Sequence, residues 1–395
     1  MVSRSQLQRR LKEAAWLHHA DTKAIFSLLD GETQRTRAVG GIVRDTLLGL
    51  ERRSAELDLA TELTPDEVLA RAGEQGIAAY PTGIAHGTVT LRLNALVAEV
   101  TTLRQDVETD GRHAVVQFGT DWLKDAERRD FTINALYADI VGELYDPLGA
   151  SGDLLPPVVR FIGDPDRRIA EDRLRVYRFF RFSASHGAER FDPAGLAAVK
   201  RAAQTLDGLS AERVGAEMRR MLGLPKIATT LRAMRDVGLL TIGTATLERL
   251  RVYTTQARQP RFLARLAIIL AGEQGDFQAL WRLSNEEIAR ARDLLAASAL
   301  LEDLRVNEAA YRYPGTLADA IDVAAVLAGW TEAGKSAVFD QLRQVALKPF
   351  PISGTDLLSH GLKPGPAIGV ELARLEQLWI RSGFSLDRET LLRQL

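Results

Sequence analysis

The spacing of apolar residues changes near residue 165, and this change limits the folds open to the chain. Residues 36–145 mix strand-like and helical patterns, with strand-like stretches in TRAVGG, AELDLAT, GTVTLRL and ALVAEVTTLR. Alternation with a period of two is typical of half-buried strands, and Asn94 lies where the last two stretches would turn into a β-hairpin. Beyond residue 165 the spacing is helical almost to the end. The sequence therefore predicts an α+β N-terminal part with a small mixed sheet, followed by an all-helical remainder.

Helix start signals agree with this division. In TPDEVLARAGEQG, Thr64 is placed as an N-cap and Pro65 at the first helical position. The run RRIAEDRLRVYRFFRFSASHG predicts one long helix, and LSAERVGAEMRRMLG predicts another that Ser210 would cap. We find no repeat of fixed period.

The chain has no cysteine, which excludes disulfides, iron–sulfur clusters and thiolate zinc sites. Its six histidines are scattered, and only His18 and His19 are adjacent. Adjacent residues on a helix point apart, so a histidine-built metal site is disfavoured. Any metal is therefore expected to bind carboxylates.

No apolar run approaches the roughly 20 residues that span a bilayer, so we expect no membrane association. The N-terminal segment MVSRSQLQRRLKEAAWL lacks the apolar core of a secretory signal. It resembles a transit peptide in its basic, amphipathic character, but the spacing of Leu7, Leu11, Ala14 and Leu17 suits a surface helix equally well. We expect a cytoplasmic protein.

Charge is unevenly distributed along the chain. The formal net charge is -1, yet residues 160–236 hold 16 Lys and Arg against 10 Asp and Glu, a net of +6. The rest of the chain therefore sums to -7. Such a bias would steer an anionic partner toward the middle of the chain, although solvated faces of Arg-rich helices would give the same count.

Two carboxylates follow a glycine turn. An apolar strand ends in Gly40 and Gly41, a short helix with Arg44 follows, and Glu56 and Asp58 lie two apart on the next predicted strand. Side chains two apart on a strand share a face, and hard oxygen ligands suit Mg²⁺. A glycine turn at a helix N-terminus offers N–H groups to a phosphate. The pattern predicts a metal-assisted triphosphate site, while the acid pair alone also fits a solvated strand face.

Later segments of the chain add further charged groups to this predicted site. Glu99 would bring a third carboxylate on a neighbouring strand. EDRLRVYRFFRF places Asp172, Arg175, Arg178 and Arg181 at every third position, a slowly drifting polar stripe on a helix. The stripe would present donors and acceptors to a base, or form a salt-bridged helix face.

Eight motifs follow one another along the chain: GGIVRDTLLG, ELDLAT, PTGIAHGTVT, EVTTLR, DGRHAVVQF, RRDFTINALYAD, YDPLG and FIGDPDRRIAEDRLRVYRFFRF. In this order they resemble bacterial tRNA nucleotidyltransferases, the CCA-adding enzymes of the class that also contains bacterial poly(A) polymerases. The resemblance is strong over residues 36–225 and looser beyond. It implies a nucleotidyltransferase head at 1–158, a neck with base-recognition helices at 159–225, and a helical, tRNA-binding body and tail at 226–395.

The resemblance also implies an activity. This is the template-independent addition of C, C and A to the 3′ end of tRNA from CTP and ATP, with release of diphosphate. Mg²⁺ would be the cofactor, and the tRNA 3′ end and acceptor stem would be the partner. The oligomeric state stays open.

Residue roles follow from the same resemblance. Glu56 and Asp58 match the metal-binding acid pair, and Glu99 matches the third catalytic acid. The positions that match nucleotide contacts are Gly41, Arg44, Arg129, Asp172, Arg175, Arg178 and Arg181. Among them, Asp172 and Arg175 match the pair that reads the Watson–Crick edges of C and A. Residues 101–118 match the flexible loop that family members use in switching from C to A addition.

Two departures from the family pattern lie at the catalytic turn. The first acid is normally Asp and is Glu56 here, and the stretch LERRSA lengthens the turn before it. Mg²⁺ demands near-octahedral geometry, so both departures bear on activity. A non-catalytic tRNA- or RNA-binding paralogue, and a relative that adds part of CCA or poly(A), stay open as alternatives. The intact segment DVETDGRHAVVQF, and the lack of a GRRF-type signature after the acid pair, favour full CCA addition.

Overall fold

The computed structural model of the chain describes residues 4–50, 56–110, 113–155, 157–206 and 208–395. They form two compact units. Unit 1 comprises residues 1–214 and 236–239, and unit 2 comprises residues 215–235 and 240–395. The predicted division into head, neck, body and tail is a different one and stays a prediction.

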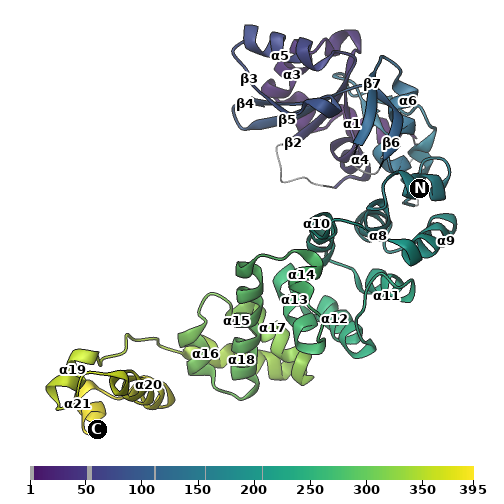
Figure 1. Cartoon of the computed structure of the whole chain (residues 1–395). Coiled ribbons are helices and arrows are strands. Elements are labelled where there is room, and N and C mark those ends of the chain that lie inside the picture. Colours follow the sequence, from purple (N-terminus) through teal and green to yellow (C-terminus); the bar gives the residue numbers. More distant parts are fainter. Residues whose placement is uncertain (1–3, 51–55, 111–112, 156, 207) are drawn as a thin grey trace. The chain divides into compact units, whose positions relative to one another are not determined.

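Unit 1 is built on a mixed seven-stranded sheet with the order β3-β4-β5-β2-β1-β8-β9. Figure 1 labels its strands β2, β3, β4 and β5. Its strands are β1 Thr36–Val39, β2 Glu56–Thr61, β3 Ala78–Gly83, β4 Thr88–Leu93, β5 Leu96–Thr102, β8 Tyr137–Ala138 and β9 Leu144–Tyr145. Strand β2 runs parallel to β5 and antiparallel to β1. A second, two-stranded sheet pairs β6 Arg104–Asp110 with β7 His113–Phe118.

Among the helices of unit 1, α3, α4 and α5 pack directly on the strands of this sheet, while α7, α8 and α9 pack on one another. They are α1 Arg4–Lys12, α2 Ala15–His18, α3 Ala20–Leu28, α4 Gly41–Leu48, α5 Pro65–Glu74, α6 Trp122–Glu127, α7 Pro165–Glu171, α8 Arg175–His186 and α9 Pro193–Ala202. Helix α10, Ala211–Leu222, begins in unit 1 and ends in unit 2.

Several predicted elements of the head are confirmed. Strands β4 and β5 form the expected hairpin, with Asn94 at a φ of 53° in the turn. Helix α5 starts at Pro65, and Thr64 caps it in a capping box with Glu67. The predicted strands around TRAV and ELDLAT are β1 and β2.

The prediction of one long helix from the RRIAEDRLRVYRFFRF run is wrong at Asp172. Helix α7 ends at Glu171, Asp172 has the extended angles φ -149° and ψ 104°, and α8 starts at Arg175. The Asp172 carboxylate accepts a hydrogen bond from the backbone N–H of Leu174 at 3.1 Å. An aspartate that binds backbone two residues on competes with the helical pattern, so the polar stripe keeps only its three arginines on one helix.

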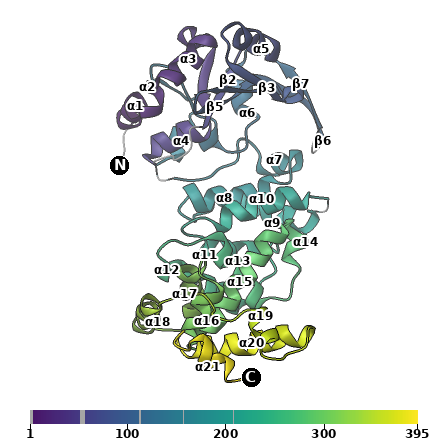
Figure 2. The same cartoon turned by 90° about the vertical axis from the view of Figure 1, so that its left-hand side faces the viewer.

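The N-terminal segment packs onto the head through its apolar spacing. Leu7, Leu11 and Leu17 are fully buried. Helix α1 lies beside α4, as Figure 2 shows. None of the described helices has the length and apolar character needed to cross a membrane.

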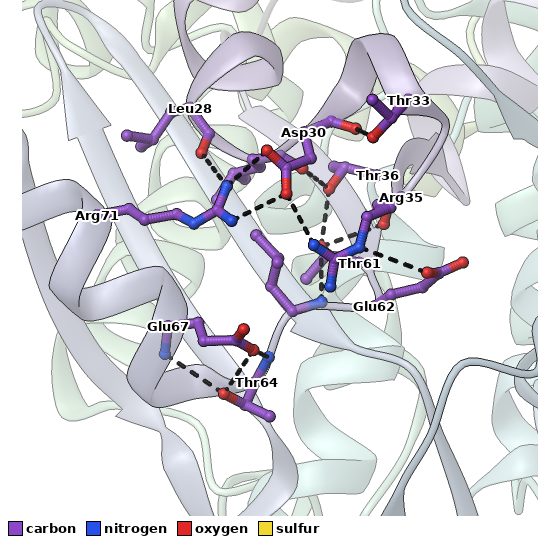
Figure 3. A network of polar contacts seen from close by, with 12 residues as sticks. Leu28, Asp30, Thr33, Arg35, Thr36, Thr61, Glu62, Thr64, Glu67 and Arg71 are labelled. Atoms are coloured by element: carbon purple, nitrogen blue, oxygen red, sulfur yellow. Dashed lines mark hydrogen bonds and ion pairs between the residues drawn. The ribbon is translucent and has the colours of Figure 1, made fainter.

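A polar network fixes the end of strand β2 that lies beyond its acids (Figure 3). Asp30 accepts hydrogen bonds from Arg71 at 2.7 and 2.9 Å and from Arg35 at 2.8 Å. The hydroxyls of Thr61 and Thr36 are 2.7 Å apart, which joins β2 to β1. The strand that carries Glu56 and Asp58 is therefore anchored three residues after the second acid.

Unit 2 is helical throughout its described part. From α11 to the end, the helices are α11 Ala228–Asp236, α12 Thr244–Gln256, α13 Phe262–Gly272, α14 Phe277–Trp281, α15 Asn285–Glu302, α16 Val306–Arg312, α17 Leu317–Ala328, α18 Glu332–Gln344, α19 Gly354–Ser359, α20 Pro366–Arg381 and α21 Arg388–Leu392. One buried cluster joins α15 to α17, and a second, around Trp379 and Phe384, holds the last three helices together. The predicted helical character of this region is confirmed.

Candidate functional site

The site is built where β2 and β5 run side by side. Asp58 of β2 is the register partner of Glu99 of β5, and Glu56 is the partner of Val97. Alternate residues of a strand share a face, so Glu56, Asp58 and Glu99 project to one side of the sheet. Thr101 follows on the same face, which makes this face of the sheet polar.

The glycine turn lies against these acids. Gly40 adopts φ 70° and ψ -129°, a region that side-chain-bearing residues rarely occupy, and helix α4 begins at Gly41. A Cβ atom at Gly40 would lie 3.7 Å from Oδ2 of Asp58. The first N–H groups of α4 lack intrahelical acceptors, so the turn brings donors next to a carboxylate.

A cleft of about 340 Å³ opens over this face. It is lined by both kinds of group that a metal-bound triphosphate requires, acids and arginines. The lining residues are Val39, Gly40, Asp58, Leu59, His86, Thr88, Glu99, Thr101, Arg104, Arg128 and Arg129. Three guanidinium groups therefore share one cleft with two carboxylates.

A buried aspartate orients two of these arginines. Asp125 accepts hydrogen bonds from Arg128 and Arg129, at 2.8 Å and 2.9 Å, and from the Tyr137 hydroxyl at 2.8 Å. Burial alone would raise the pKa of Asp125, but Arg129 and Arg128 outweigh it and lower the pKa to about 2. The same contact raises the pKa of Arg129 against its own burial. Asp125 therefore holds both guanidinium groups in place at the cleft.

The carboxylates have an environment that favours a bound cation. Partial burial raises the pKa of Glu99, and the charges of Asp58 and Glu56 raise it further. A divalent cation would relieve this repulsion. Within the described part of the chain no three acidic or histidine side chains are arranged to hold a metal by themselves. Mg²⁺ commonly takes one or two carboxylates and completes its shell with substrate phosphates, which this cleft permits.

Arg44 is not among the residues that line the cleft. Its side chain is buried, donates to Asp45 at 2.8 Å and to Asn134 at 2.6 Å, and lies 5.2 Å from the centre of the Phe182 ring. Arg178 and Arg181 also approach this ring, at 5.3 and 4.0 Å. Three predicted nucleotide-binding arginines therefore meet at Phe182, beside and not among the residues that line the cleft.

Asp172 and Arg175 lie at the junction of α7 and α8, and each forms an ion pair there. Asp172 accepts from Arg213 at 2.8 Å, and Arg175 donates to Glu171 at 2.8 Å. Arg175 also reaches the backbone carbonyl of Arg128 at 3.3 Å. The junction thus contacts the main chain of a residue whose side chain lines the cleft.

The structure brings Asp58, Glu99 and Arg129 together in the cleft, with Gly41 directly after the turn. Asp125 was not among the residues predicted from the sequence, although its spacing of three and four residues from the two arginines that follow α6 was a usable signal. Glu171, four residues before Arg175, was not predicted either. The lengthened turn at residues 51–55 and residues 111–112 of the predicted flexible loop lie outside the described residues.

Family models match two parts of the chain. One, described as the Poly A polymerase head domain, matches residues 36–160. Another, described as a probable RNA and SrmB-binding site of polymerase A, matches residues 190–242. The first contains every residue of the cleft.

Relatives match over nearly the whole length. The mitochondrial CCA tRNA nucleotidyltransferase 1 of Danio rerio is 33% identical over 410 residues, covering 98% of this chain and 93% of its own. The CCA-adding enzyme of Limosilactobacillus fermentum is 31% identical, covering 90% of this chain and 91% of its own. Among solved structures, the Bacillus stearothermophilus CCA-adding enzyme in complex with CTP superposes with a TM-score of 0.76 and 25% identity, covering 92% of this chain and 94% of its own.

Proposed function

This chain belongs to the family of CCA-adding tRNA nucleotidyltransferases, and from that premise we propose that it adds C, C and A to the 3′ end of tRNA. It takes CTP and ATP, works without a nucleic-acid template and releases diphosphate. The observation that carries the proposal is the register of Asp58 with Glu99, beside the Gly40 turn, in a cleft with three arginines. A cytoplasmic location is part of the proposal.

The chain's own groups bind the reactants in this cleft. Arg104, Arg128 and Arg129 offer positive charge to a triphosphate, and the Gly40 turn lets the backbone approach it without a Cβ in the way. Asp58 and Glu99 would hold a divalent cation, with Glu56 as the further acid of the pair. We propose Mg²⁺, because all of these ligands are hard oxygens. When bound, such a cation stabilises the charge of the phosphates and activates the attacking 3′ hydroxyl.

Base selection is assigned to Asp172 and Arg175. A carboxylate accepts from the exocyclic amine of C or A, and a guanidinium donates to the neighbouring ring nitrogen. G and U present the opposite polarity at these edges and would leave buried groups unpaired, which is costly. Because both side chains are in ion pairs, with Arg213 and Glu171, the incoming base would have to take over these hydrogen bonds.

The remaining assignments keep the sequence-based division. The head at 1–158 would carry catalysis, the neck at 159–225 base recognition, and the body and tail at 226–395 the grip on tRNA. Duplex RNA is recognised by phosphates and 2′-hydroxyls more than by sequence, which suits a surface of arginines.

The test is single-nucleotide extension of a tRNA that lacks its CCA end. Purified full-length protein is incubated with this tRNA, labelled CTP and ATP, and Mg²⁺, in parallel with Glu56→Asp and with Asp58→Asn as the inactive control. We expect three added nucleotides from the wild type, and at least about a hundredfold loss in Asp58→Asn, since one metal ligand oxygen is removed.

The other outcomes separate the alternatives. Extension by Glu56→Asp alone would mean a tRNA-binding relative that one methylene disables. One, two or many added residues would mean partial or poly(A) addition. No extension by either protein, with tRNA binding retained, would overturn the catalytic proposal.

A further inference from the structure

A buried histidine at the end of α8 contacts α4 across a long separation in sequence. Nε2 of His186 lies 3.1 Å from Oδ1 of Asp45, 141 residues away. The two side chains are only 11% and 13% exposed, so the contact is inside unit 1 and not a solvated surface pair. Nδ1 of His186 lies 2.6 Å from the hydroxyl of Ser185, which fixes the ring on its other side.

The same carboxylate oxygen also orients Arg44. Nε and Nη2 of Arg44 reach Oδ1 of Asp45 at 2.8 and 2.7 Å, and Nη1 donates to Oδ1 of Asn134 at 2.6 Å. The planar guanidinium group of Arg44 therefore donates to two partners at once. A guanidinium held in this way has one orientation, and Asp45 sets it.

The hydrogen bonds continue from Asn134 and return to α8. Its Nδ2 donates to Oδ1 of Asp130 at 3.0 Å, and Arg178 donates to Oδ2 of Asp130 at 2.8 Å. Arg178 and His186 are eight residues apart on α8, about two helical turns. The contacts thus form a closed ring of hydrogen bonds, which runs from His186 of α8 through α4 and back to α8 at Arg178. Phe182 lies between the two, and Arg44 and Arg178 both contact its ring.

We propose that His186 is a positioning residue for the nucleotide site, which acts through Asp45 to hold Arg44 and the first turn of α4 in register with α8. Arg44 stands in the first turn after Gly40, and Gly40 lies against Asp58. Helix α8 starts at Arg175, the proposed base-reading residue. The ring therefore links the turn proposed for the triphosphate to the helix proposed for the base, so this inference rests on the proposed function.

The protonation states agree with this role. Burial lowers the pKa of His186, so the neutral ring donates through Nε2 at neutral pH. Burial alone would raise the pKa of Asp45, but the His186 hydrogen bond and Arg44 outweigh it and the pKa is lowered. A neutral donor on a buried carboxylate fixes the orientation of that carboxylate without adding charge to the ring of hydrogen bonds.

The test compares His186→Leu with His186→Gln, which keeps a donor, and with Ser183→Ala, a buried change on the same helix outside the ring. We expect His186→Leu to raise KM for CTP and ATP about tenfold, the size of one lost hydrogen bond to a buried charge. KM for tRNA should stay unchanged. His186→Gln should stay within about threefold of the wild type.

A purely structural role predicts something different, namely a lower melting temperature and a lower kcat with both KM values unchanged. That result, or a His186→Gln variant as impaired as His186→Leu, would overturn the proposal. If His186→Leu does not fold, Asp45→Asn provides the same comparison and should raise the nucleotide KM alone.

A wild type that extends no tRNA would refute the proposed function. In that case, the rise in melting temperature on adding CTP would be measured for His186→Gln and for Asp45→Asn. Loss of this rise in Asp45→Asn alone would support the proposed role of the hydrogen-bonded ring. Loss in both variants, or in neither, would overturn it.

Discussion

At the scale of single residues, Gly40 has a backbone conformation that disfavours any side chain. Its φ of 70° is unfavourable for any side chain, so we expect Gly40→Ala to cost about 1–3 kcal/mol in free energy of unfolding. The strain is next to Asp58, and kcat for CTP addition should fall with it. Urea denaturation and single-turnover extension measure the two effects.

The control is Gly73→Ala in helix α5, where an added Cβ meets no atom within 4 Å. Alanine is the better helix former, so this variant should gain about 0.5–1 kcal/mol and keep full activity. Equal stability changes in the two variants would contradict the role of the turn conformation.

Residue patterns also show how far the sequence predicts the site. The shared face of Glu56, Asp58 and Glu99 follows from strand periodicity, because a period of two leaves no choice of side once the pairing is known. The contact of His186 with Asp45 has no local signal, since it depends on where two helices pack. The partners of Arg44, Asp45 and Asn134, likewise could not be read from the sequence motif, because Asn134 lies 90 residues away along the chain.

At the scale of elements, helix α4 is held at both ends. Its first turn meets the acids, while Arg10 of α1 donates to the carbonyl of Leu47 in its last turn and Trp16 donates to Thr46 at 2.9 Å. The final carbonyls of a helix lack intrahelical donors, so a guanidinium there satisfies an otherwise unpaired acceptor. The N-terminal segment is therefore part of the support for the nucleotide site.

We expect Arg10→Met to lower the free energy of unfolding by about 1 kcal/mol, because the carbonyl of Leu47 loses its donor. Arg9→Met is the matched control. The Arg9 side chain is 69% exposed and its pair with Glu13 is long, at 4.0 Å, so its loss should be within about 0.5 kcal/mol. Chemical denaturation of the three proteins measures both changes, and equal losses would contradict the cap.

Element existence was predictable where local signals agree with tertiary packing. The hairpin of β4 and β5 and the capped start of α5 have turn and cap residues that point the same way as the apolar pattern. The break between α7 and α8 at Asp172 was not predictable, because the helical spacing of the sequence continues through it. Only the contacts of Asp172 with Leu174 and Arg213 favour the extended conformation there. Residues 101–118 were expected as a flexible loop from the family resemblance alone, and the backbone of this segment includes the paired strands β6 and β7.

At the scale of the whole molecule, acid should weaken unit 1 through its buried carboxylates. Unit 1 contains two buried aspartates, Asp125 and Asp130, whose pKa values are lowered to about 2 by arginines and hydrogen bonds that outweigh burial. Their unfolded value is near 3.8. A carboxylate with a lowered folded pKa stabilises the fold above the unfolded value, and this contribution is lost as pH falls toward 2.

Asp125→Asn should therefore destabilise unit 1 by on the order of 2 kcal/mol at pH 6, and the gap to the wild type should close as pH falls from about 4 to 2. Hydrogen exchange of peptides from residues 122–138, with urea unfolding at each pH, measures this gap. Asp166→Asn is the control, because its partner Arg201 is on the surface and both side chains are more than half exposed. It should show no comparable pH-dependent gap. A gap that stays constant for Asp125→Asn down to pH 2 would mean that its cost comes from lost packing, and the two cleft arginines would then be held by the fold and not by the charge of Asp125.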